Sequence, residues 1–323
     1  MFTDRPVLVT GATGVVGPFL VAQLINSGYR VRVLARSAPS PSLFPASVEV
    51  FSGRIEDRQA VDAAMSDVGA VFHLAAQLHL PNPAPELREQ YERTNVEGTR
   101  CVVESANHVG VTRFVHFSTI NVYGPSQPGQ LFNESTALRP DSWYAETKVR
   151  AEKIALEYAP TVVLRLSAVY GPGMKGNYPR LLAALKRGRF AMLGAGHNRR
   201  TVVHVRDVAT AALLVATHPA TIGKVYNVTD GEVHELRAII AAMSLALGRR
   251  PPRLYLPVAP VKLATGFIED GLRLIGRRSP IDRNTIAKLL EDIAVSGQRL
   301  QDELGFHPSY SLNEGWREIA LAL

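Results

Sequence analysis

The stretch that decides the fold of this 323-residue chain is Val7-Leu-Val-Thr10-Gly11-Ala-Thr-Gly14-Val-Val-Gly17. Four residues that are apolar or favour strands run into three glycines spaced three apart, and a stretch compatible with a helix follows over residues 18–27. The pattern predicts a strand, a tight turn and a helix. Gly11 allows the sharp turn, Gly14 lets the backbone come close to phosphate oxygens, and Gly17 lets the helix pack close to the strand.

The start of this predicted helix suits an anionic ligand. A helix N-terminus offers free N–H groups and the positive end of the helix dipole, so we expect the pyrophosphate of a dinucleotide to bind here. The spacing is Gly-x-x-Gly-x-x-Gly rather than the commoner Gly-x-Gly-x-x-Gly. A purely structural turn in an α/β domain is therefore the alternative interpretation.

Length and composition allow a large α/β core with room for a second lobe, since 46% of the 323 residues are hydrophobic. The sequence contains no apolar run close to the ~20 residues that span a bilayer, and no signal-peptide pattern precedes the glycine turn. We therefore expect a soluble, cytoplasmic protein without a membrane partner. The single cysteine, Cys101, excludes an internal disulfide and a cysteine-based metal cluster.

The net charge of +7 makes a nucleic-acid partner worth testing against the sequence. The basic residues are spread out, with separate pairs at Arg199-Arg200, Arg249-Arg250 and Arg277-Arg278 and no interleaved aromatic residues. This distribution argues against nucleic acid. An anionic small-molecule substrate explains the excess of positive charge at least as well.

The residue after the second predicted strand, residues 30–35, bears on the choice of dinucleotide. An acidic residue at this place binds the ribose 2′-hydroxyl of NAD, whereas a cationic residue accommodates the 2′-phosphate of NADP. This chain has Arg36 and no acid there. We therefore favour NADP(H) over NAD(H), with a solvated surface arginine as the alternative role of Arg36.

Alternation of short strands and helices continues through the first half of the chain. The further elements expected are strands over residues 48–51, 70–74, 113–117 and 162–164 and helices over 57–65, 86–108 and 142–158. Such alternation predicts an α/β fold with a Rossmann-type, doubly wound parallel sheet.

The composition changes after Tyr170-Gly-Pro-Gly173 to a mixed and then basic, helical stretch interrupted by prolines. We expect this part to form a smaller, mostly helical lobe that covers the carboxyl edge of the sheet and contacts the substrate. The predicted dinucleotide domain comprises residues 1–169, with about 200–228 returning to it. The substrate lobe then comprises residues 170–199 and 229–323.

Tyr144 and Lys148 are the residues most suited to catalysis. They are four apart in a predicted helix with Ser142 as its N-cap, so they share one helix face. A phenol with a pKa near 10 must be made more acidic to relay a proton at neutral pH, and a nearby ammonium together with the positive nicotinamide ring can do this. Thr119, at the end of the preceding strand, offers a hydroxyl to the reacting oxygen and to the phenol. A surface pair is the alternative.

Taken in order, the motifs of the chain resemble those of the extended short-chain dehydrogenase/reductase family, the NAD-dependent epimerase/dehydratase group. The motifs are Thr10-Gly-Ala-Thr-Gly-Val-Val-Gly17, His73-Leu-Ala-Ala76, Asn95-Val-Glu-Gly-Thr99, Ser118-Thr-Ile-Asn-Val-Tyr-Gly124, Tyr144-x-x-x-Lys148, Leu164-Arg165, Tyr170-Gly-Pro-Gly173 and Val203-His-Val-Arg-Asp-Val-Ala209. The resemblance covers nearly the whole chain, and the ordered set is far more specific than any one motif.

The resemblance implies a set of site residues. It makes Tyr144, Lys148 and Thr119 catalytic. The expected cofactor-binding residues are Gly11, Thr13, Gly14, Val15, Val16, Arg36, Leu74, Ala75, Ala76, Asn95, Ser118, Tyr144 and Lys148. The expected substrate-binding residues are Gln77, Tyr170, Asn177 and Arg200, the last matching an arginine that grips a diphosphate. No metal is expected, because His204 and Asp207 are too few to form a site.

The family resemblance also suggests three functions. The first is hydride transfer at C4 of a nucleotide-linked sugar, by a 4-epimerase or a 4-ketoreductase. Ala168 stands where sugar epimerases commonly have asparagine, which leaves open a 3β-hydroxysteroid or dihydroflavonol type of dehydrogenase acting on a hydrophobic alcohol or ketone. The third is a non-catalytic redox sensor that binds the dinucleotide. A homodimer that pairs through the helices over 86–108 and 142–158 is also expected.

Overall fold

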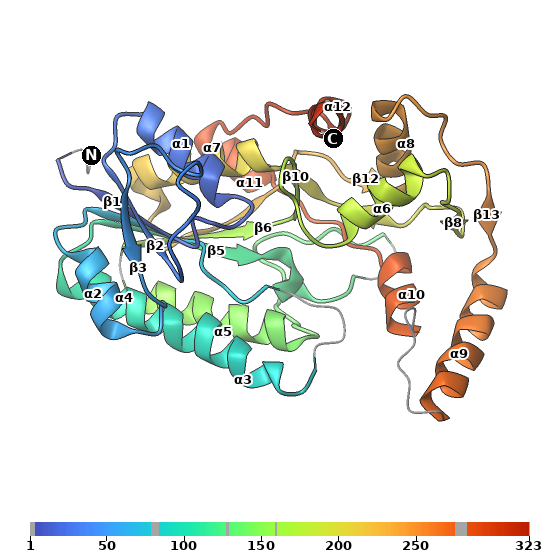
Figure 1. Cartoon of the computed structure of the whole chain (residues 1–323), viewed down its shortest axis with the longest axis horizontal. Coiled ribbons are helices and arrows are strands. Elements are labelled where there is room, and N and C mark those ends of the chain that lie inside the picture. Colours follow the sequence, from blue (N-terminus) through green and yellow to red (C-terminus); the bar gives the residue numbers. More distant parts are fainter. Residues whose placement is uncertain (1–3, 79–83, 127–128, 159, 275–282, 323) are drawn as a thin grey trace.

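The computed structural model of the chain describes residues 4–78, 84–126, 129–158, 160–274 and 283–322. Its centre is a seven-stranded sheet in the order β11-β6-β5-β4-β1-β2-β3, in which all neighbouring strands are parallel (Figure 1). The strands are β1 (Val7–Thr10), β2 (Val31–Ala35), β3 (Glu49–Ser52), β4 (Ala70–His73), β5 (Arg113–Thr119), β6 (Thr161–Leu166) and β11 (Val225–Val228). The expected doubly wound sheet is confirmed.

The strand order changes direction at β1, which lies between β2 and β4. In open parallel sheets of this kind, ligands bind at such a switch point, outside the carboxyl ends of the strands. The glycine turn follows β1, so the fold places it at this crevice.

Helices cover both faces of the sheet (Figure 1). One face carries α1 (Gly17–Asn26), α7 (Val205–Thr217) and α11 (Gln298–Leu304), and the other carries α2 (Arg58–Met65), α4 (Gly98–His108) and α5 (Trp143–Glu157). Val7 and Val9 pack toward α1 and α7, whereas Leu8 packs toward α2 and α4. Because successive side chains of a strand point to opposite faces, each central strand is apolar on both sides.

The helix expected over residues 86–108 contains a π-helical turn. It consists of α3 (Leu87–Tyr91), the π turn η1 (Glu92–Glu97) and α4. A Cβ on Gly98 would lie 2.6 Å from Cδ1 of Ile55. The glycine inside this helix is therefore explained by close packing against Ile55, on the α2 side of the sheet.

The smaller lobe is mostly helical, as expected. Its elements are β7 (Ala168–Tyr170), α6 (Asn177–Lys186), β8 (Met192–Leu193), β9 (Arg199–Arg200), β10 (Val202–His204), β12 (His234–Glu235), α8 (Leu236–Ala246), β13 (Tyr255–Leu256), α9 (Val258–Leu274), α10 (Arg283–Leu290) and α12 (Leu312–Leu321). The 3-10 turns η2 (Ile120–Tyr123) and η3 (Pro219–Thr221) complete the chain's described elements.

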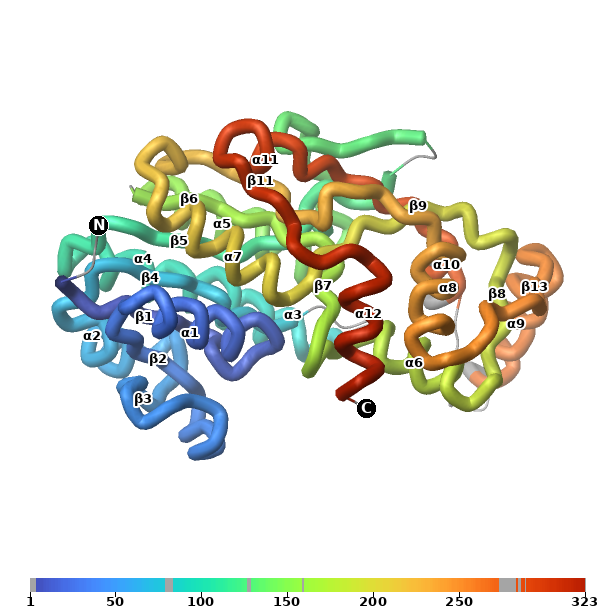
Figure 2. The backbone as a smooth tube through the Cα atoms, turned by 90° about the horizontal axis from the view of Figure 1, so that it is seen from above, coloured from blue at the N-terminus to red at the C-terminus, as the bar shows by residue number. Residues whose placement is uncertain are grey.

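The chain after α10 returns to the sheet before it ends. In Figure 2, α11 lies over β11, and α12 follows near the smaller lobe. Leu300 and Phe306 belong to the hydrophobic core that β1, α1 and α7 form. Residues 298–306 therefore pack with the dinucleotide domain, which differs from the boundary expected from composition alone. Within the described ranges, no helix is both long and apolar enough to cross a membrane.

Candidate active site

Two glycines of the turn after β1 are required by close backbone contacts. Gly11 has a φ of 69°, and a Cβ there would lie 2.6 Å from the backbone nitrogen of Ala75. A Cβ on Gly17 would lie 2.0 Å from the backbone oxygen of Ala12. Gly11 thus joins the turn to the loop after β4, and Gly17 packs on the turn itself rather than on the strand.

The same turn has room for a phosphate. Thr13 and Gly14 are exposed, and the N–H of Gly14 donates a 2.9 Å hydrogen bond to the backbone oxygen of Gly11. Among the residues that the structure describes, no side chain caps the N-terminus of α1. The N–H groups there are available to an anion, so the turn fits the pyrophosphate of a dinucleotide.

A buried histidine holds the ends of β1 and β4 together. His73 Nδ1 lies 2.8 Å from Oγ1 of Thr10, and its Nε2 lies 3.0 Å from Oγ1 of Thr99. Burial, with Lys148 as a second cause, lowers the pKa of His73 to about 3, so the ring is neutral. Thr10 Oγ1 also accepts a 3.3 Å hydrogen bond from the N–H of Ala75. The histidine is structural, and it orients the loop that contains Leu74, Ala75 and Ala76.

Asn95 connects this loop to α5. Its Oδ1 accepts a 2.7 Å hydrogen bond from the N–H of Gln77, and its Nδ2 donates to Oγ1 of Thr147 at 3.1 Å. The side chain is buried. Asn95, expected to bind the cofactor, and Gln77, expected to bind the substrate, therefore hold each other beside the glycine turn.

Tyr144 and Thr119 meet at the carboxyl edge of the sheet. Thr119 is the last residue of β5, and Tyr144 is in the first turn of α5, whose N-cap is Ser142 as predicted. The Thr119 hydroxyl accepts a 3.2 Å hydrogen bond from the N–H of Asn121 and also bonds the Tyr144 phenol. Because its oxygen already accepts from Asn121, its proton is free to donate to the phenol oxygen.

The structure corrects the expected acidity of this phenol. Burial raises the pKa of Tyr144 to about 12, and the hydrogen bond from Thr119 lowers it by less than burial raises it. The ammonium of Lys148 does not supply the expected shift, because its Nζ donates a 2.6 Å hydrogen bond to the backbone oxygen of Phe117. Nζ also lies 3.3 Å from Nε2 of His116. A shared helix face therefore did not bring the ammonium to the phenol.

Lys148 is itself desolvated. Burial lowers its pKa to about 8, and the nearby carboxylate of Glu152 opposes this effect. Burial also lowers the pKa of His116 well below its usual value, so a neutral imidazole faces the ammonium. The lysine is thus a buried group whose charge depends on its partners at the end of β5.

Sequence reasoning missed a buried polar chain behind these residues. Ser118 donates a hydrogen bond to Glu152, and Glu152 forms a 2.7 Å ion pair with Arg165. Arg165 donates to the hydroxyl of Tyr123 at 3.0 Å, and that hydroxyl donates to Asn227 at 2.8 Å. The signal was available, since Glu152 follows Lys148 by four residues and so shares its helix face. Ser118, expected to bind the cofactor, begins this chain.

Arg200 lies at the end of α10. Its guanidinium donates hydrogen bonds to the backbone oxygens of Glu291 and Leu289, the latter at 3.4 Å. Burial lowers its pKa, whereas Tyr178 raises it. A cation at the C-terminal end of a helix is favourable. Arg200 therefore joins β9 to α10 in the smaller lobe.

Asn177 and Tyr170, the other two residues expected to bind the substrate, differ in exposure. Asn177 is exposed and begins α6. Tyr170 is fully buried, and its ring stacks on Trp316 with 5.0 Å between centroids. Tyr170 is therefore part of the core of the smaller lobe.

Arg36 is exposed directly after β2, at the strand edge next to the glycine turn. Within the described residues it forms no ion pair. Its guanidinium is therefore available to an anionic ligand. Among these residues there is also no group of three or more histidine, cysteine or acidic side chains that could hold a metal ion.

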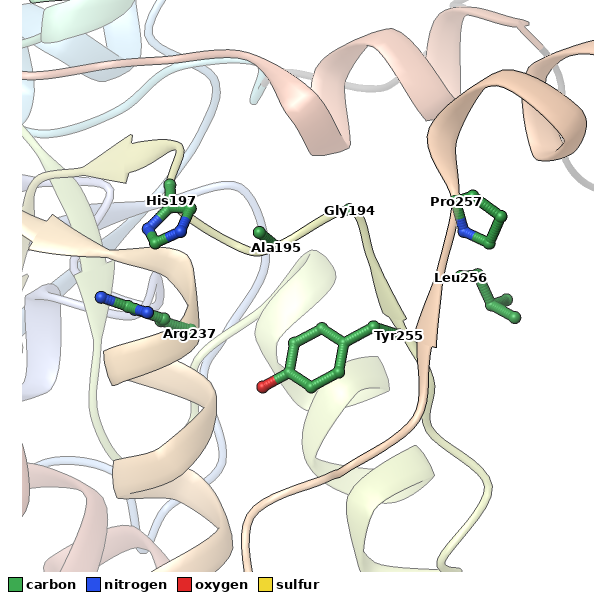
Figure 3. Close-up of a pocket in the computed structure, with 7 residues that line it drawn as sticks. All are labelled: Gly194, Ala195, His197, Arg237, Tyr255, Leu256 and Pro257. Atoms are coloured by element: carbon green, nitrogen blue, oxygen red, sulfur yellow. The ribbon is translucent and has the colours of Figure 1, made fainter.

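The smaller lobe contains a hollow of about 540 Å³. It is lined by Gly194, Ala195, His197, Arg237, Tyr255, Leu256 and Pro257. Figure 3 shows the ring of Tyr255 on the side of α8, with Leu256 on the opposite side of β13. The lining comes from the β8–β9 connection, α8 and the β13 region, so the hollow belongs to the lobe and not to the carboxyl edge of the sheet.

These features together are those of an enzyme of the extended short-chain dehydrogenase/reductase class. The chain belongs to the NAD dependent epimerase/dehydratase family, which it matches over residues 7–229.

Its relatives include both reductases and epimerases. The chain is 28% identical to the "4-hydroxy-2-methyl-3-oxo-4-farnesyl-3,4-dihydroquinoline-1-oxide ketoreductase" of Stigmatella aurantiaca, over 92% of this chain and 90% of the relative. It is 27% identical to the "UDP-glucose 4-epimerase" of Vibrio cholerae, over 98% and 95%. Among solved structures it resembles "MoeE5 in complex with UDP-glucose and NAD", with 28% identity, a TM-score of 0.75 and coverage of 98% and 97%.

Proposed function

We propose that the protein transfers hydride at C4 of a nucleotide-linked sugar, as a 4-ketoreductase or a 4-epimerase. The observation that carries the proposal is the hydrogen bond between Thr119 and Tyr144 at the carboxyl edge of the sheet, on the side where the glycine turn accepts a dinucleotide. The similarity to a UDP-glucose 4-epimerase and to a structure with UDP-glucose supports the sugar nucleotide.

In this proposal Tyr144 donates or accepts the proton, and Thr119 lowers the pKa of the phenol. In the reducing direction the phenol donates its proton to the C4 oxygen, and in the oxidising direction the phenolate removes a proton from the C4 hydroxyl. Thr119 donates to the phenol oxygen and so stabilises the phenolate. A bound nicotinamide would supply the hydride chemistry at C4, and in its oxidised form it would add a positive charge that favours the phenolate of Tyr144.

Lys148 and the loop after β4 position the dinucleotide. The buried ammonium lies at the end of β5, where it can donate to the hydroxyls of the nicotinamide ribose while it keeps its bond to Phe117. Gly11, Thr13 and Gly14 would hold the pyrophosphate. Asn95 acts by holding the loop through Gln77.

We further propose that Arg36 binds the 2′-phosphate of NADP(H). The side chain is exposed and forms no ion pair within the part of the chain that the structure describes. Arg36→Ala should raise the dissociation constant for NADPH by about ten-fold, the scale of one charge-assisted contact, and should leave that for NADH unchanged. Fluorescence titration of both dinucleotides measures this. Equal weakening of both would contradict the assignment.

A second candidate is a reductase of a hydrophobic ketone. Its specific support is the relative from Stigmatella aurantiaca, whose named substrate carries a farnesyl chain. Ala168, in place of the asparagine of sugar epimerases, is compatible with it. In this case the same Tyr144 and Thr119 serve, and only the contacts of the smaller lobe differ.

Calorimetry with uridine diphosphate separates the two candidates. The sugar-nucleotide proposal requires saturable binding to the protein loaded with its dinucleotide, and no binding would remove it. The cofactor released by denaturation is then identified by mass. Retained NAD indicates an epimerase, which returns the hydride to the same substrate, whereas an exchangeable NADPH indicates a reductase.

We also propose that the protein works in the cytoplasm as a homodimer, in which the outer faces of α4 and α5 pair. Both helices lie on one face of the sheet (Figure 1). Light scattering measures the mass of the assembly, and a monomer would contradict the proposal.

A further inference from the structure

Three large apolar residues of α9 face solvent, beside the exposed charged residues Lys262 and Asp270. Leu263 is 64% exposed, Phe267 75% and Ile268 55%. The opposite side carries Thr265 and Gly266, both buried, the latter against the guanidinium of Arg283 at the start of α10. An ordinary surface helix presents polar residues to water, so a helix with three large apolar side chains in water favours a partner that covers them.

Exposed apolar residues continue from α9 into the segment before it. Of the fifteen large apolar residues that are exposed in the described part of the chain, seven lie between residues 245 and 268. The seven are Leu245, Leu254, Tyr255, Leu256, Leu263, Phe267 and Ile268. In Figure 1, α8, β13 and α9 follow one another along one outer edge of the smaller lobe.

Two basic loops meet beside these residues. Strands β8 and β13 are parallel, and the N–H of Met192 donates a 2.9 Å hydrogen bond to the backbone oxygen of Leu254. A Cβ on Gly188 would lie 3.4 Å from a guanidinium nitrogen of Arg249. The segments that lead into the two strands therefore lie side by side.

These segments carry six exposed cations. They are Lys186, Arg187, Arg189, Arg249, Arg250 and Arg253. None of the six forms an ion pair with a residue that the structure describes, and the sequence has no acidic residue over 186–196 or 245–258. These two segments therefore carry a local charge of +6, against a net charge of +7 for the whole chain.

We propose that this surface, made of the six cations and the exposed apolar residues other than Tyr255, which lines the hollow, docks on an anionic lipid bilayer. We call it the lipid-facing rim. Unpaired cations are attracted to the phosphates of lipid headgroups, and apolar side chains beside them insert at the boundary of headgroups and acyl chains. The sequence predicted no membrane partner because it contains no segment that could span a bilayer. Docking on the surface of a bilayer does not require such a segment.

Two other partners fit the rim less well. A second copy of the chain, placed by a two-fold axis on the same surface, would bring two sets of six cations together. A nucleic acid would match the cations but would leave Leu263, Phe267 and Ile268 in water, because its outer surface is phosphate. Of these three partners, only a bilayer offers both an anionic layer and an apolar layer.

The test is sedimentation of the full-length protein with vesicles of phosphatidylcholine, with and without phosphatidylglycerol. We expect binding to the anionic vesicles that weakens with salt. One cation near such a surface contributes about five-fold in binding, so the triple variant R249Q/R250Q/R253Q should bind on the order of 100-fold more weakly. The double variant L263S/F267S should lose about ten-fold or more.

A matched control is R317Q/L321S, which removes one exposed cation and one exposed leucine from α12. It should bind vesicles as the unmodified protein does. All substituted side chains are exposed, so the thermal midpoint should be unchanged in each variant. The proposal does not depend on the identity of the substrate, and the vesicle assay needs no turnover.

Several results would overturn the proposal. Failure of the unmodified protein to sediment with anionic vesicles at low salt would do so, as would equal loss of binding in the α12 control. Duplex DNA binding that survives L263S/F267S, without vesicle binding, would identify nucleic acid as the partner. A dimer that L263S/F267S converts to monomer, again without vesicle binding, would identify a second copy.

Discussion

The carboxyl edge of the sheet and the lipid-facing rim differ in how their charges are matched. At the sheet edge Lys148, Glu152 and Arg165 are buried, and each has a hydrogen-bond or ion-pair partner. At the rim Arg249 and Arg250 are exposed and form no ion pair within the described residues. An unpaired charge is costly only when it is buried. The buried charges at the sheet edge therefore each have a partner within the protein, whereas the exposed cations of the rim stay available to a partner outside it.

The comparison predicts the largest effect for Tyr144→Phe at the sheet edge. Loss of the proton-relaying hydroxyl should lower kcat about a thousand-fold, within the range for general acid–base groups. The dissociation constant of the dinucleotide should change little. Tyr255→Phe removes a hydroxyl of the smaller lobe, away from the sheet edge, and should leave kcat unaltered. Steady-state rates of both variants decide this, and a Tyr144→Phe variant with near-normal kcat would refute the catalytic assignment.

The next effect is on stability. Glu152→Gln leaves the buried guanidinium of Arg165 without its carboxylate, which should lower the free energy of unfolding by about 3 kcal/mol. The control is Glu104→Gln, because Glu104 pairs with Arg58 on the surface. That variant should unfold at the same urea concentration as the unmodified protein. Similar destabilisation by both changes would show that burial is not what distinguishes the two pairs.

A smaller effect follows from pH. Burial holds the pKa of His73 at about 3, against 6.5 for an ordinary histidine. The unfolded chain therefore binds a proton that the native protein excludes. The contribution of the neutral His73 ring to the free energy of unfolding is full above pH 6.5 and declines as the pH falls toward 3. Between these limits the loss is about 1.4 kcal/mol per pH unit.

His73→Gln should remove this dependence. Urea unfolding at about pH 6.5 and about pH 5 should show the variant losing about 2 kcal/mol less than the unmodified protein over this interval. The exposed His307→Gln variant should show the full loss. An unchanged slope in His73→Gln would mean that the ring accepts a proton inside the native protein.

The smallest effect is expected at the rim. Phe267→Ser should change the free energy of unfolding by no more than about 0.5 kcal/mol, because the side chain is 75% exposed. Phe72→Ala, in the buried strand β4, should cost about 3 kcal/mol or more. Urea unfolding of the pair measures both. Strong destabilisation by Phe267→Ser would show that α9 is covered within the protein itself.

The sequence predicted the sheet well because buried parallel strands appear as short apolar runs between glycine turns and helices. The predicted ends differ by one or two residues. The strand expected over 113–117 continues as β5 to Thr119, because Ser118 and Thr119 still pair with β6. Polar residues at a strand end give no periodic signal, so pairing rather than composition decided where β5 stops.

The candidate site was only partly predictable. A spacing of four placed Tyr144 and Lys148 on one face of α5, and the strand end placed Thr119 near them. The spacing could not tell that the ammonium turns to the backbone oxygen of Phe117. The lowering of the Tyr144 pKa that was expected from the ammonium is therefore absent, and burial raises this pKa, because desolvation and side-chain direction depend on packing.

By itself the sequence determined the doubly wound sheet, the position of the glycine turn and the family, since these depend on residue order and on local backbone preferences. The tertiary structure decided which charges are buried, which partner each one has and which apolar residues stay in water. It joined Glu152 to Arg165 across 13 positions and brought Gly188 next to Arg249 across the lobe. The physical reason is that burial and electrostatic pairing are properties of neighbours in space, which a linear spacing does not specify.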